Sequence, residues 1–94
     1  MLTPVRSSQF KRDVKRVQKR GKDMDKLRRL LGLLLEQAPL PDTYQDHALQ
    51  GNWKGYRDAH IEPDWLLLYR VVDDQLQLAR TGSHADTLFF LSPA

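Results

Sequence analysis

The nearly unbroken apolar run WLLLYRVV at residues 65–72 constrains the fold of this chain more than any other feature. A run of this length that ends in β-branched valines is typical of a central strand covered on both faces. Leucine then alternates with glutamine in the stretch 75–81, which predicts a second strand with one apolar face. The pair Asp73-Asp74 between the two runs favours a tight hairpin turn. The second half of the chain is therefore expected to form a sheet.

The first half of the chain shows helical spacing instead. Apolar residues recur at i, i+4 and i+7 between positions 10 and 17, after the potential N-caps Ser7 and Ser8 and before the potential stop Gly21. A second helix is expected to begin at Asp23 and to be ended by Pro39 and Pro41. Its wide leucine face predicts that it is largely buried, and Gly32 within it is interpreted as a close-packing position. Two helices joined by so short a link predict a helical hairpin.

Two further strands complete the expected order. Residues 2–6 contain Pro4 and fit an edge strand, and residues 52–61, bounded by Gly51 and Pro63, fit the first strand of a hairpin. The order β-α-α-β-β-β predicts an α+β fold, a small sandwich with two helices packed on an antiparallel sheet. One domain is expected over residues 1–94, with 91–94 as a flexible tail. Four aromatic residues are expected in its core: Trp53, Tyr56, Trp65 and Tyr69.

Charge is distributed unevenly along the chain. Residues 1–36 hold 11 Lys and Arg against 4 Asp and Glu, whereas residues 37–94 hold 4 against 8. A basic segment of this kind favours a polyanionic partner such as nucleic acid, although a solvated helix surface has the same composition. The chain has no cysteine, which excludes a disulfide, a thiolate metal site and a cysteine nucleophile. No apolar run approaches the ~20 residues that span a bilayer, and we expect a cytoplasmic protein without a membrane partner.

The expected strand pairing gathers polar residues at one edge of the sheet. His60 and Asp64 flank the turn at Glu62-Pro63, and the last strand carries Arg80 and His84 back beside them. Two histidines can share the roles of proton acceptor and donor, and an arginine can hold two phosphoryl oxygens. RNA brings its own nucleophile, the 2′-hydroxyl, so this set suits RNA cleavage without a metal or other cofactor. Each histidine alone also fits a plain surface role, and the spacing gives a metal site little support.

Three segments of the sequence resemble the YafQ-type toxins of the RelE/ParE superfamily. They are KRDVKRVQKRGKDMDKLRRLLGLLLEQAPLPDTYQDH, DHALQGNWKGYRDAHIEPDWLLLYR and LARTGSHADTLF, which together cover about residues 8–89. The resemblance implies a RelE-like fold and a ribosome-dependent endoribonuclease, the toxin of a type II toxin–antitoxin pair. It would cut translated mRNA in the ribosomal A site. The implied partners are a DinJ-like antitoxin, small-subunit rRNA and mRNA, with DNA reached only through the antitoxin.

The resemblance also implies which residues act in the reaction. His47 matches the histidine of the DHxL segment, His60 that of RDAH, and Asp64 the aspartate of EPDW. Arg80 and His84 match the arginine and histidine of RTGxH. We expect His84 as general acid, with Asp64 or His60 near the 2′-hydroxyl. The aromatic residue that orients mRNA would be Phe89 or Phe90, since this chain has one more residue than the family before that position.

The basic first helix acquires a specific interpretation from the resemblance. Its cations would hold ribosomal RNA through phosphate contacts, and the same surface could serve an acidic antitoxin segment. These residues are Lys11, Arg12, Lys15, Arg16, Lys19, Arg20 and Lys22. Two other functions stay open: a non-enzymatic ParE-like toxin that acts on DNA gyrase, and a structural RNA-binding module that cuts nothing.

Overall fold

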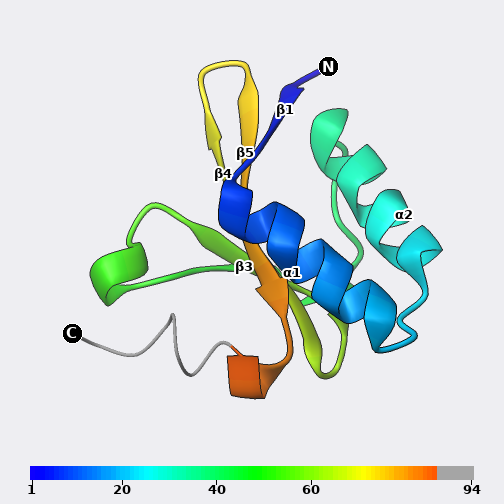
Figure 1. The fold of residues 1–94 in the computed structure, drawn as a ribbon. Helices are drawn as coiled ribbons and strands as arrows, with labels where there is room; N and C mark the ends of the chain where they lie inside the picture. The colour runs from blue at the N-terminus through cyan, green and yellow to red at the C-terminus, as the bar shows by residue number, and fades with distance from the viewer. Residues whose placement is uncertain (87–94) are drawn as a thin grey trace.

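The computed structural model describes residues 1–86, which form one five-stranded sheet with two helices on one side (Figure 1). The helices are α1 (Ser8–Lys19) and α2 (Met24–Leu35), and two 3₁₀ turns are η1 (Asp42–Tyr44) and η2 (Gly51–Trp53). The strands are β1 (Thr3–Arg6), β2 (His47–Ala48), β3 (Arg57–Glu62), β4 (Trp65–Val72) and β5 (Gln75–Gly82). The predicted α+β architecture is confirmed. Within the described range, no helix is long and apolar enough to cross a membrane.

The sheet is mixed rather than wholly antiparallel, which corrects the sequence prediction. Its order is β1-β5-β4-β3-β2, and β1 runs parallel to β5, with Thr3 opposite Gln75. The tight turn at Asp73 makes β5 run antiparallel to β4. The φ of Asp73 is 54°, a left-handed conformation that two-residue hairpin turns favour. Sequence periodicity identifies strands but carries no information about their direction, so it could not reveal this parallel pair.

The strand expected over 52–61 begins only at Arg57. Residues 51–53 form η2, and the two-residue strand β2 was not foreseen. Trp53 and Tyr56 are half-buried and lie outside the core cluster, contrary to expectation. Their rings pack edge to face with centroids 5.0 Å apart, so each ring covers part of the apolar surface of the other.

The core lies between the helices and one face of the sheet. Trp65, Leu67 and Tyr69 alternate along β4 and pack with the buried leucines of α2 and with Phe10 of α1. The intervening residues of β4 are buried as well, so that positions 65–69 are all at most 2% exposed. The expectation of a central strand buried on both faces is confirmed for residues 65–69, whereas Val71 and Val72 at the end of the run are 48% and 37% exposed.

Both helices begin at the predicted caps. The Ser7 hydroxyl accepts a hydrogen bond from the backbone N–H of Phe10 at 2.9 Å, and Asp23 caps α2 in the same manner. Gly21 follows α1 with φ of 83°, which permits the backbone to turn back on itself.

The end of α2 differs from the prediction, because the helix stops at Leu35, ahead of both prolines. Gln37 adopts a left-handed φ of 56°, and its N–H donates to the carbonyl of Leu34. The chain therefore ends this helix through a left-handed cap. Gly32 is exposed, and a Cβ built there would meet nothing within 4 Å, so the interpretation as a close-packing glycine is wrong.

Candidate active site

Three histidines from separate segments form a row at one end of the sheet. The ring centroids of His47 and His60 are 6.1 Å apart, and those of His60 and His84 are 5.7 Å apart. A hollow of about 530 Å³ opens beside the row and is lined in part by His60, His84 and Pro63. Across residues 1–86, no group of three or more His, Asp or Glu side chains has an arrangement that could hold a metal ion. The ring distances and the hollow show that three titratable rings lie side by side at a concave surface.

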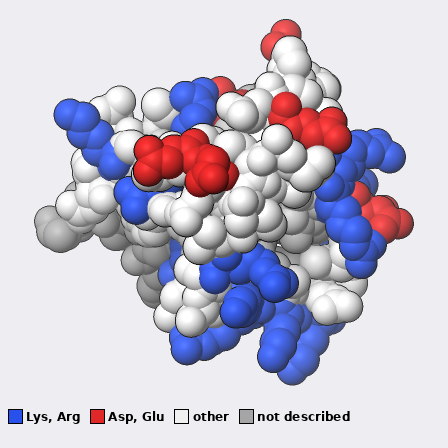
Figure 2. All heavy atoms as spheres, turned by 90° about the horizontal axis from the view of Figure 1, so that it is seen from above, with Lys and Arg blue, Asp and Glu red and all other residues white. Residues whose placement is uncertain are grey.

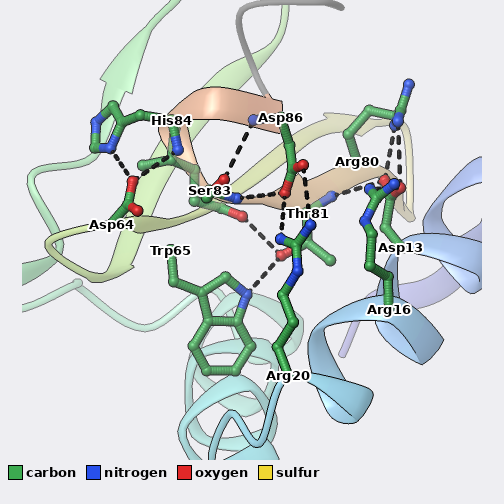
Figure 3. A network of polar contacts seen from close by, with 11 residues as sticks. Asp13, Arg16, Arg20, Asp64, Trp65, Arg80, Thr81, Ser83, His84 and Asp86 are labelled. Atoms are coloured by element: carbon green, nitrogen blue, oxygen red, sulfur yellow. Dashed lines mark hydrogen bonds and ion pairs between the residues drawn. The ribbon is translucent and has the colours of Figure 1, made fainter.

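Asp64 fixes the orientation of His84. Its Oδ1 accepts hydrogen bonds from the backbone N–H of His84 at 2.7 Å and from the ring Nδ1 at 2.6 Å (Figure 3). The backbone hydrogen bond and then the ring hydrogen bond lower the pKa of Asp64 below its usual range. A carboxylate accepts only, so Nδ1 carries a proton and Nε2 is the ring atom that can exchange one. Both side chains are more than half exposed, so a substrate can reach them.

A buried carboxylate that the sequence analysis missed lies beneath the row. Asp58 is 5% exposed, and its Oδ2 lies 3.6 Å from Nε2 of His47. Burial raises the pKa of Asp58, and the neighbouring His60, His47 and His84 oppose this shift. Alternation within RDAH was an available signal, because it places Asp58 and His60 on the same face of one strand.

Arg80 belongs to the same face of the sheet, but its guanidinium turns toward α1. In the strand register Arg80 lies opposite Leu68, which lies opposite Asp58. Its Nε donates to Asp13 at 2.7 Å and its Nη2 at 3.2 Å (Figure 3). Asp13 is 1% exposed and also accepts from the Thr81 N–H at 3.2 Å. Nothing in the sequence singles out Asp13, because a lone aspartate in a basic helix gives no sign of partners 67 residues away.

A second carboxylate stabilises the turn that leads into His84. Asp86 accepts hydrogen bonds from Arg20 at 2.8 Å and from the Ser83 N–H at 2.9 Å. The Arg20 contact, more than any other, lowers the pKa of Asp86 to about 2. A Cβ on Gly82 would lie 2.7 Å from an Asp86 oxygen, so glycine permits this close approach. Phe89 and Phe90, expected to contact mRNA, lie outside the described residues, as does the expected tail at 91–94.

The seven basic residues predicted to contact ribosomal RNA divide into two groups. Three of them are engaged in ion pairs: Arg16 with Asp13, Arg20 with Asp86, and Lys22 with Glu62. The other four are exposed and have no ion pair within residues 1–86: Lys11, Arg12, Lys15 and Lys19. Figure 2 shows blue side chains gathered along the lower margin of the view with no red among them. The available positive charge is therefore smaller than the composition suggested.

A groove between the helices adjoins this basic surface. Its volume is about 510 Å³, and both helices contribute apolar side chains to it. Basic residues from β1, α1 and α2 also line it. The full lining is Arg6, Phe10, Lys11, Val14, Lys15, Gln18, Met24, Leu27, Arg28 and Leu31.

Comparison with known proteins identifies the family of this chain. The model of the family described as "Bacterial toxin of type II toxin-antitoxin system, YafQ" matches residues 2–89. The chain belongs to the YafQ toxin family. The mRNA interferase toxin YafQ of Escherichia coli K12 is 58% identical over 80 residues, which are 84% of this chain and 87% of the relative. An mRNA interferase is an endoribonuclease, and this chain is an enzyme of that class.

Solved YafQ structures share the whole described fold. The crystal structure of YafQ from E. coli BL21(DE3) has a TM-score of 0.87 and 51% identity, covering 93% of this chain and 98% of that one. YafQ in the E. coli DinJ–YafQ complex has a TM-score of 0.84 and 53% identity, covering 92% of this chain and 97% of that one. The mixed sheet with two helices is therefore the YafQ architecture.

Proposed function

We propose that this YafQ-family chain acts in the cytoplasm as a ribosome-dependent endoribonuclease that cuts translated mRNA in the A site. The observation that carries the proposal is the row of His47, His60 and His84 beside a hollow, with Asp64 bonded to the end of the row. The name of the E. coli relative, an mRNA interferase, supplies the substrate class.

The proposed chemistry needs two proton transfers. A base takes the proton of the 2′-hydroxyl, the 2′-oxygen attacks phosphorus, and the bond from phosphorus to the 5′-oxygen breaks. An acid protonates that oxygen, so the products are a 2′,3′-cyclic phosphate and a 5′-hydroxyl. We assign the acid to His84, because Asp64 holds its Nδ1 and leaves Nε2 to deliver the proton. His60 is the proposed base, since Asp64 already accepts two hydrogen bonds and its lowered pKa makes it a weaker base.

The remaining site residues act on charge and on the bases in this proposal. Arg80 would stabilise charge on the phosphoryl oxygens, with Asp13 holding its guanidinium in place. His47, with the Asp58 carboxylate 3.6 Å from its Nε2, lies at the end of the row away from His84. Phe89 or Phe90 would stack an unpaired base, a contact typically worth ~1–3 kcal/mol.

The exposed helix surface suits two polyanionic or acidic partners. Lys11, Arg12, Lys15 and Lys19 would contact ribosomal RNA through phosphates, with a strong dependence on salt. The groove between α1 and α2 has apolar residues as well as cations, which fits an amphipathic acidic segment of a DinJ-like antitoxin. Its E. coli relative is found in complex with DinJ. DNA would be reached only through that antitoxin.

Cleavage of an mRNA on programmed ribosomes tests the proposal. His84→Ala is expected to slow cleavage by ~10²–10⁴-fold, the usual contribution of one proton-transfer group. Arg29→Ala, an exposed residue outside the site and the groove, is the control and should cut at the parent rate. Undiminished cleavage by His84→Ala would refute the mechanism. Intact mRNA with inhibited gyrase supercoiling would favour a ParE-like toxin, and intact mRNA with ribosome binding alone would favour an RNA-binding module.

A further inference from the structure

The segment that carries His47 is weakly held by its own backbone. Strand β2 has only two residues, His47 and Ala48, and it pairs with β3 alone at the edge of the sheet. Gln45, just before it, has a left-handed φ of 48°. So short an edge strand contributes little stability by itself. Other contacts must hold the His47 ring in the row.

The side chain of Asp46 supplies such contacts. Its Oδ2 accepts a hydrogen bond from the Tyr69 hydroxyl at 2.8 Å, and its Oδ1 accepts from Arg57 Nε at 2.9 Å. Tyr69 is 2% exposed and lies in the core on β4, directly opposite Arg57 on β3. One carboxylate is thus bound from two adjacent strands of the sheet. Burial, together with Asp46, raises the pKa of Tyr69 well above its ordinary value, so the hydroxyl remains a donor at physiological pH.

We propose that Tyr69 and Arg57 are positioning residues that act through Asp46 to hold His47 in the imidazole row. Asp46 precedes His47 directly, and the His47 ring donates from Nδ1 to the carbonyl of Gln45 at 2.9 Å. The ring and its main chain therefore both depend on the segment that Asp46 anchors. None of the three anchoring residues needs to contact RNA. The link to activity rests on the role proposed above for His47.

Hydrogen exchange measures the anchor without reference to activity. Tyr69→Phe removes one hydroxyl and leaves the buried ring in place. We expect amide exchange in residues 45–48 to become faster by about tenfold, the effect of losing one hydrogen bond to a charged group. Tyr44→Phe is the matched control. Tyr44 lies two residues before Asp46 in the chain, and its hydroxyl has no hydrogen bond within residues 1–86. Unchanged exchange in Tyr69→Phe would overturn the anchor.

A double-variant cycle then separates positioning from general stability. Tyr69→Phe should lower kcat by about tenfold with little change in KM, and should have no further effect on kcat in a His47→Ala background. Asp46→Asn, which keeps an acceptor oxygen, should retain more activity than Asp46→Ala. An equal loss of kcat in both backgrounds would show a merely structural role and refute the positioning. If His47→Ala itself cuts at the parent rate, the proposed role of His47 fails, while the exchange result still decides whether the anchor exists.

Discussion

Replacing Asp13 by alanine tests the buried ion pair that links the first helix to the sheet. The carboxylate is 1% exposed and accepts hydrogen bonds from Arg16, from two nitrogens of Arg80 and from the Thr81 backbone N–H. It joins α1 to β5 just ahead of the turn that carries His84. Its loss would leave the Thr81 N–H without its acceptor and Arg80 without this counter-ion.

The magnitude follows from burial. Removing one member of a buried ion pair costs about 3–5 kcal/mol, because the remaining charge stays desolvated. Arg80 is 20% exposed, so water would recover part of this energy, and we expect a loss of about 3 kcal/mol. A domain of this size has a free energy of unfolding of roughly 5–14 kcal/mol, so the variant would fold with a much smaller margin. Asp13→Asn, which keeps one acceptor oxygen, should lose about half as much.

Urea denaturation monitored by tryptophan fluorescence measures these losses. Asp25→Asn is the control, because Asp25 pairs with Arg28 on the exposed surface of α2, where such pairs contribute ~0–1 kcal/mol. A loss below about 1 kcal/mol for Asp13→Ala would refute the reasoning, since it would mean that the buried pair is not energetically coupled to folding.

Three further outcomes follow from the same structure. Gly32→Ala should raise the free energy of unfolding by about 0.5–1 kcal/mol in thermal melts, because its Cβ meets nothing in a helix; a loss would contradict this. Gly82→Ala should lower it by about 1–3 kcal/mol, because its Cβ would lie 2.7 Å from Asp86; a neutral result would contradict the close approach. Because the pKa of Asp86 is lowered to about 2, its ionised form stabilises the fold above about pH 4, and this contribution is lost as the pH falls toward 2. Arg20→Gln should therefore cost about 1 kcal/mol at pH 7 and almost nothing at pH 2, and a cost independent of pH would argue against the pair.

Local patterns predicted much of the fold. The apolar run at 65–72 and the alternation after it identified the central hairpin, and the caps Ser7 and Asp23 located both helix starts. Strand direction and the two-residue strand at 47–48 depend on pairing between distant segments, which no local period reports. Trp53 has the composition of a core residue but lies in a 3₁₀ turn, where it is only half-buried.

The candidate site shows the same division. Hairpin topology was enough to bring His60, Asp64 and His84 together, because the turns that join β3 to β4 and β4 to β5 are both short. Asp13 and Asp58 escaped detection, since a buried carboxylate is distinguished by partners on other elements rather than by its neighbours in the chain. Two of the seven basic residues, Arg20 and Lys22, were overcounted for the same reason, because their acidic partners lie far away in the sequence. Arg16 pairs with Asp13 three residues earlier on the same helix.

The central claim is that the imidazole row drives attack by the 2′-hydroxyl of the RNA. The most direct measurement is single-turnover cleavage of an A-site mRNA that carries one 2′-deoxynucleotide on the 5′ side of the scissile phosphate. The account predicts that this message stays intact while the all-ribose message is cut to a 2′,3′-cyclic phosphate. Cleavage of the 2′-deoxy message at the same bond and at a comparable rate would contradict it.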